Sequence, residues 1–207
     1  MKTQMRFQKI IALLSLIIAA LVFVYALYFL TGSPGRVAKY IPPEANEDMI
    51  NGQDFFDASQ SFVDVLTVLG IIFILSAVLL YVMGCQKRRN YYLTNYIAVG
   101  VYLVIAVAVI IYMIIGVSNC MNLYLNGICW DSGTGQYGIY NVADQFDRQN
   151  PLYKEYTNFI LGYVVCVLVL ACAGCLALST ALKYKLMKGE KQLLQGATVA
   201  EPVKEEA

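Results

Sequence analysis

The sequence has no histidine and few charged residues, and these two shortages restrict its chemistry. Charged residues make up 14% of the 207 residues, against about 25% in an average soluble domain. The missing histidine removes the commonest metal ligand and general base. The chain also contains no P-loop, no Gly-x-Ser-x-Gly, no His-Glu-x-x-His and no paired Cys/His metal spacing. We therefore expect a protein that is not an enzyme and needs no cofactor.

The sequence is instead rich in long apolar segments. Hydrophobic residues make up 59% of the chain, and about 20 consecutive apolar residues are enough to cross a bilayer. The runs predict an all-α membrane protein, a four-transmembrane-helix bundle made of two hairpins within residues 1–182. Its spans are about 10–30, 62–84, 93–116 and 157–182, separated by polar loops 31–61 and 117–156. The polar tail, 183–207, is expected to be disordered.

The first run could be read as a signal peptide, because Lys2, Arg6 and Lys9 precede it. However, its 21 uncharged residues exceed the roughly 7–15 of a signal sequence, and residues 31–35 make a poor cleavage site. We expect a retained first span.

Cations and acids are unevenly distributed along the chain. Eleven of the fifteen Lys and Arg residues lie in the first nine residues, in the turn at 85–92 and in the tail. The two long loops hold ten acidic residues, if Asp64, just after the first loop, is included. The positive-inside rule then places both termini in the cytoplasm and both long loops outside a cell membrane. Within the turn, Lys87, Arg88 and Arg89 are expected to contact anionic headgroups at the membrane surface.

Two of the six cysteines share the second long loop. Cys120 and Cys129 are nine residues apart, and an oxidising exterior would allow them to form a disulfide worth about 2–3 kcal/mol. The alternative is a pair of free thiols.

Cys172 and Cys175 form a Cys-x-x-Cys motif, which can act as a redox pair. At 1.5 Å per residue, Cys172 lies ~22 Å below the outer end of its span, far from the loop cysteines. We therefore expect these residues, with Cys166, to be small packing residues rather than a relay.

Small residues recur at helical spacing and predict the contact faces, because they let membrane helices approach closely. In the second span these residues are Gly70, Ala77 and Gly84; in the fourth they are Ala173 and Ala177.

No charged residue lies deep in any span, which disfavours a proton-coupled transporter or pump. The hydroxyls considered as a possible pore lining are Thr67, Ser76, Ser179 and Thr180. We expect these side chains to bond to their own helix backbones instead.

The two halves resemble each other in order and in detail. Residues 54–57 match 144–147, Gly70 and Gly162 each follow a leucine, and Gly32 and Gly116 each follow a tyrosine by four positions. A duplication would explain this, as in other membrane bundles. Similar composition of apolar helices is the alternative.

No motif fixes an activity, so function rests on weaker signals. Uncharged spans and aromatic loops favour a structural, accessory or interaction role, with membrane lipids and another membrane protein or a second copy as partners and no nucleic acid. The alternatives are a small-solute channel or transporter and, with less support, a membrane thiol oxidoreductase.

Overall fold

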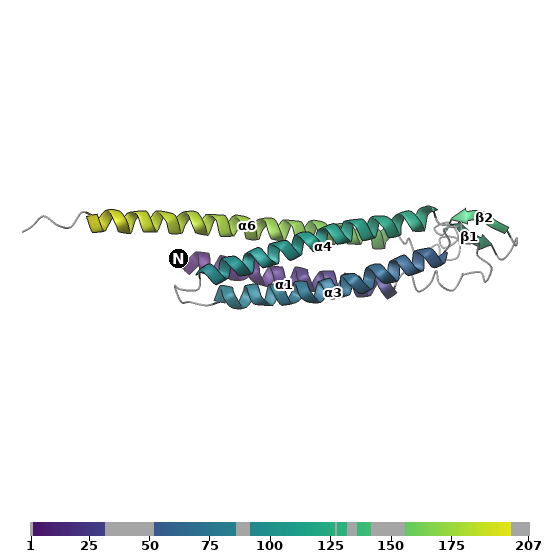
Figure 1. Cartoon of the computed structure of the whole chain (residues 1–207), viewed down its shortest axis with the longest axis horizontal. Helices are drawn as coiled ribbons and strands as arrows, with labels where there is room; N and C mark the ends of the chain where they lie inside the picture. Colours follow the sequence, from purple (N-terminus) through teal and green to yellow (C-terminus); the bar gives the residue numbers. More distant parts are fainter. Residues whose placement is uncertain are drawn as a thin grey trace, which may run out of the picture.

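In the computed structural model, four long helices run side by side, and two short strands follow the third of them (Figure 1). The helices are α1 (Lys2–Thr31), α3 (Gly52–Cys85), α4 (Tyr92–Asn126) and α6 (Tyr156–Val199). The strands are β1 (Ile128–Asp131) and β2 (Gln136–Asn141). The structure describes these six elements, and it describes side chains for residues 9–29, 31, 55–83, 96–125, 158–185 and 188.

Each helix contains a stretch long and apolar enough to cross a membrane, as predicted. These stretches are Lys9–Phe29, Phe55–Met83, Tyr96–Leu125 and Asn158–Lys185. A helix is the favoured state there because it satisfies its backbone N–H and C=O groups internally, where lipid offers no partners. The multi-pass helical bundle is thus confirmed.

The helices form a ring of antiparallel neighbours. α1 packs along α3 and α6, and α4 packs along the same two helices. Every helix therefore contributes one buried face to a continuous core and leaves the opposite face exposed. The exposed faces are rich in Leu, Ile and Val, which suits contact with lipid chains.

Two predicted loop segments are in fact helical, because α3 and α4 extend beyond their apolar runs. α3 begins at Gly52 and α4 ends at Asn126, so residues 52–61 and 117–126 belong to helices. The rings of Phe55 and Tyr124 lie 5.5 Å apart and are almost fully buried. Their mutual burial stabilises the extra turns, which project toward the strands (Figure 1).

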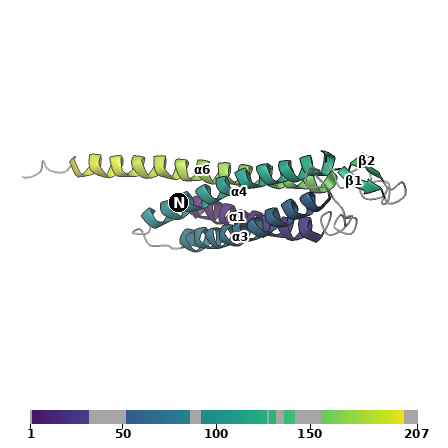
Figure 2. The same ribbon diagram turned by 45° about the vertical axis from the view of Figure 1, so that its right-hand side comes forward.

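A two-stranded antiparallel hairpin lies at this end of the molecule and was not predicted (Figure 2). Trp130 pairs with Tyr137, and the register shifts between Cys129 and Trp130. A four-residue segment with two glycines, 132–135, separates two runs rich in aromatic and β-branched residues. That pattern is a recognised hairpin signal.

α6 also continues past its predicted end. It runs to Val199, so the expectation of disorder from residue 183 is wrong as far as 199; residues 200–207 lie outside the described part. Residues 183–199 are mostly good helix formers without proline, which explains the extension. The added turns carry α6 beyond the other helices, at the end opposite the hairpin (Figures 1 and 2).

Candidate functional site

An aromatic cluster from all four helices fills the bundle interior near the hairpin end. Neighbouring ring centroids lie 5.5–5.9 Å apart in mostly tilted or edge-on geometries, which aromatic pairs favour. Phe29 of α1 links the two halves of the cluster, because it contacts both Phe62 of α3 and Phe159 of α6. The members of this aromatic cluster are Tyr25, Phe29, Phe55, Phe62, Tyr112, Tyr124 and Phe159.

Two glycines make room for rings of the cluster. A Cβ at Gly116 of α4 would collide with the ring of Phe62, which is also stacked on Tyr112. A Cβ at Gly162 of α6 would collide with the Tyr25 hydroxyl. An alanine at either position would have to displace a packed side chain, so both positions favour glycine. Both glycines are among the positions that recur between the two halves of the sequence, a pattern that does not indicate what they contact.

Hydrogen bonds join helices at the same level. The Tyr25 hydroxyl donates to the Asn158 carbonyl at 3.2 Å, and the Tyr112 hydroxyl donates to the Phe62 carbonyl at 3.4 Å. On the exposed surface, the hydroxyls of Ser118 and Tyr163 lie 3.2 Å apart. The polar tips of the aromatic residues are thus used to hold neighbouring helices together.

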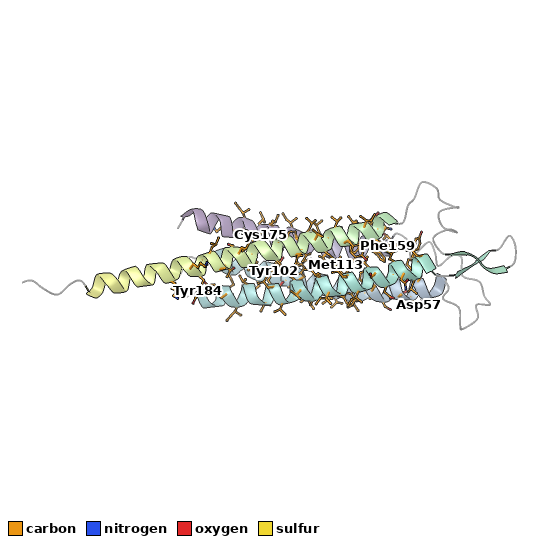
Figure 3. The ribbon with its side chains drawn as sticks, turned by 90° about the horizontal axis from the view of Figure 1, so that it is seen from above. Asp57, Tyr102, Met113, Phe159, Cys175 and Tyr184 are labelled. Atoms are coloured by element: carbon orange, nitrogen blue, oxygen red, sulfur yellow. The ribbon has the colours of Figure 1, made fainter. Side chains whose placement is uncertain are left out.

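A smaller polar cluster lies deeper in the bundle, toward the end where α6 projects. Ser15 of α1, Tyr102 of α4 and Cys172 of α6 meet there, and all three are buried. Figure 3 shows Tyr102 and Met113 between Asp57 at the hairpin end and Tyr184 at the other. The sequence did not point to Ser15, because a single serine in an apolar segment does not indicate which residues of other helices it will contact.

Two of the hydroxyls considered as a pore lining behave as expected. Ser76 donates to the Phe73 carbonyl at 2.7 Å, and Thr180 donates to the Leu176 carbonyl at 2.8 Å. Both bonds lie within one helix, so these side chains are satisfied without any ligand.

Cys120 is a buried free thiol that faces the interior of the bundle. Ser59 donates to its Sγ across 3.8 Å. Helix α4 extends past Cys120, and its side chain therefore faces α3. The sequence had placed Cys120 in a loop spanning residues 117–156, where no such contact is expected. The structure lends no support to the Cys120–Cys129 disulfide. The bridge stays a prediction, because the side chain of Cys129 lies outside the described part.

The Cys-x-x-Cys motif is split between two faces of α6. Cys172 is buried against Ser15, whereas Cys175 is exposed. Cys172 meets the side chain of Tyr102, which lies 18 residues, or ~27 Å, before Cys120 on α4, so even after the reach of that side chain Cys172 is ~20 Å further along the bundle. Cys166 is buried, as expected of a packing residue, whereas Cys175 is exposed and does not pack within the bundle.

The predicted packing residues have different outcomes. Gly70 lies against the backbone of α1, since a Cβ at this position would stand 3.3 Å from Phe23 Cα, and Ala77 is fully buried. Ala173 is buried, but Ala177 is exposed and does not pack within the bundle. The surroundings of Gly84 lie outside the described side chains.

Charged side chains, where the structure describes them, lie toward the ends of the helical bundle. They are Lys9, Asp57, Asp64, Lys183, Lys185 and Lys188. The basic turn that holds Lys87, Arg88 and Arg89 lies outside the described residues, so its contact with headgroups stays a prediction.

Comparison with known protein families, with curated proteins and with solved structures finds no match. The functional argument therefore rests on the bundle itself.

Proposed function

We propose that this protein is an accessory or structural membrane protein, which binds another membrane protein through its outer end or its helix faces. It sits in the cell membrane with both termini in the cytoplasm and is surrounded by lipid. The observation that carries this proposal is the aromatic cluster, which fills the space between the four helices.

The packed interior of the bundle favours a structural protein over a channel or transporter. Rings from all four helices contact one another at 5.5–5.9 Å near the hairpin end. Among the described side chains, apart from tyrosines and cysteines, the buried polar residues are only Ser15, Ser59, Ser76 and Asn158. Ions and polar solutes need charged or polar linings to cross at low cost, so this packing counts against a channel or transporter.

The cysteine arrangement counts against a thiol oxidoreductase. A relay needs thiols that can exchange directly, and exchange requires one sulfur to attack another. Cys120 and Cys172 are buried and ~20 Å apart along the bundle. The motif itself has one buried and one exposed cysteine.

Two surfaces are available to a partner. At the outer end, α3, α4 and the β1–β2 hairpin project past the ends of α1 and α6 (Figure 1). On α6, Gly174 and Cys175 form an exposed patch of small side chains, and a Cβ at Gly174 would meet nothing within 4 Å. Small residues on a lipid-facing surface allow a second helix to approach closely.

The test is affinity capture of tagged protein from native membranes in mild detergent, followed by quantification of what remains bound. We compare the wild type, Gly174→Leu, a chain whose residues 128–141 are replaced by a linker, and Ala108→Leu as a matched control. Ala108 is an exposed alanine on α4. A stoichiometric partner that is lost in one surface variant and kept in the control supports the proposal.

Two results would contradict the proposal. One is a protein that is captured alone in every variant, and the other is solute flux through purified protein in liposomes. Oxidative cross-linking at Cys175 separates the two kinds of partner, because only self-association joins one copy to another.

A further inference from the structure

The polar cluster of Ser15, Tyr102 and Cys172 brings together three helices at a depth where the surroundings are otherwise apolar. Ser15 Oγ and Cys172 Sγ are 3.3 Å apart. The Tyr102 hydroxyl lies close enough to both groups to interact with them electrostatically. By distance and angle, however, it has no hydrogen-bond partner. Its ring is fixed from the other side by stacking on Phe73, with centroids 4.9 Å apart. Tyr102 itself has no exposed surface.

Counting hydrogens shows what the cluster lacks. Ser15 has one hydroxyl hydrogen, and it donates to the Ile11 carbonyl at 2.9 Å. The close approach of Cys172 is then explained if its thiol donates to Ser15 Oγ. Ser15 Oγ keeps one acceptor lone pair and Cys172 Sγ keeps its own weak acceptor sites, but neither acceptor is placed so that the Tyr102 hydroxyl can donate to it directly.

An orphaned hydroxyl is costly in this environment. Burying one without a partner in an apolar medium loses the hydrogen bonds that water provides to the unfolded or exposed group. A buried water commonly makes about three hydrogen bonds to groups that would otherwise be unsatisfied. The three polar side chains here match that number, and no charged side chain is described near them that would call for an ion.

We propose that Ser15, Tyr102 and Cys172 bind one water molecule between α1, α4 and α6. The water accepts the Tyr102 hydrogen and donates its own two hydrogens to Ser15 Oγ and Cys172 Sγ. It links three helices through a single small ligand, a role beyond the scaffold function proposed above.

Infrared spectroscopy of the full chain in lipid vesicles tests this directly. Replacing ordinary water by ¹⁸O-labelled water shifts only O–H bands that belong to water. The wild type is expected to show a sharp shifted band from a bound water that is missing in Tyr102→Phe, which keeps the ring and its packing. Ser15→Ala, which removes a second partner, is expected to lose the same band.

Deuterium exchange of the thiols provides a second readout. A bound water that exchanges with bulk carries deuterium to Cys172, so its S–H band is expected to convert to S–D at least about tenfold faster than that of Cys166, a buried thiol on the same helix. A Cys172→Ala spectrum assigns the band, and circular dichroism checks that each variant is folded.

Three outcomes would overturn the proposal. The first is an ¹⁸O-sensitive band that is the same in the wild type and in Tyr102→Phe. The second is a Cys172 thiol that exchanges its hydrogen for deuterium as slowly as Cys166. The third is a Cys172 S–H band that shifts in Tyr102→Phe without any water band being lost. The last result means that Tyr102 donates directly to the thiol or to Ser15.

Discussion

The ring of Phe62 in α3 occupies the space where a Cβ at position 116 of α4 would stand. The same ring is stacked on Tyr112, one turn earlier on α4, with centroids 5.7 Å apart. Glycine at 116 therefore sets how closely α3 and α4 approach, and the aromatic cluster depends on that approach.

Gly116→Ala is expected to destabilise the bundle by about 1–3 kcal/mol, because the added methyl group must displace a packed ring. Gly100→Ala on the same helix is the control, since its Cβ would meet nothing within 4 Å. That change is expected to be neutral or to stabilise by about 0.5–1 kcal/mol through the better helix former. Unfolding titrations in mixed micelles give both free energies, and similar values for the two variants would refute the close contact.

Tyr25→Phe keeps a ring of the cluster and removes the hydrogen bond to the Asn158 carbonyl at 3.2 Å. Interhelical hydrogen bonds in membrane proteins contribute about 0.6 kcal/mol on average, and we expect a loss of that size in the unfolding free energy. Tyr28→Phe serves as control, because Tyr28 lies on an exposed face of the same helix. An equal loss in both variants would show that the Tyr25 bond contributes nothing specific.

Ala77→Leu and Ala177→Leu compare a predicted packing residue that the bundle buries with one that it leaves exposed. Ala77 has no exposed surface, so a larger side chain is expected to cost about 1–3 kcal/mol through overpacking. Ala177 is exposed, and leucine there is expected to change the unfolding free energy by less than about 0.5 kcal/mol. A large loss at 177 in the isolated protein would mean that this face packs against a second copy.

The state of Cys120 can be read by mass spectrometry after alkylation without reductant. The structure has Cys120 as a buried free thiol, so we expect no label in the folded protein and one label after unfolding in detergent. If the label appears only after a reductant is added, Cys120 is bridged and the disulfide predicted from the sequence is correct.

Orientation is testable with single cysteines in a background that lacks the native ones. Thr31→Cys is exposed at the hairpin end of α1, and Lys188→Cys is exposed on the projecting part of α6. By the positive-inside rule, an impermeant maleimide should label position 31 in intact cells and position 188 only after permeabilisation. The opposite pattern would place the termini outside.

Much of the fold could be predicted, because membrane insertion depends on properties of single segments. Whether a run crosses a bilayer depends on its length and its lack of charge, and both are visible in the sequence. All four helices were found in this way. Their ends were less accurate, since the extra turns of α3 and α4 depend on Phe55 meeting Tyr124, a contact between residues 69 positions apart.

The candidate site could be predicted only in part. Helical spacing selected Gly70 and Ala77, which the bundle buries, and also Ala177, which turns away from the core. Spacing assigns residues to a common face without saying what the face meets. Ser15 gave no signal at all, because its significance depends on two residues from other helices.

Four helices able to cross a membrane follow from the amino-acid sequence alone, because apolar length and the lack of charge are properties of each segment and need no partner. Which glycines face packed rings, which cysteines are buried and which hydroxyls meet depends on how the helices pack together. Those properties arise where helices that are far apart in the sequence approach one another within a few ångströms. Packing at such short distances depends on whether the side chains of the facing helices fit together.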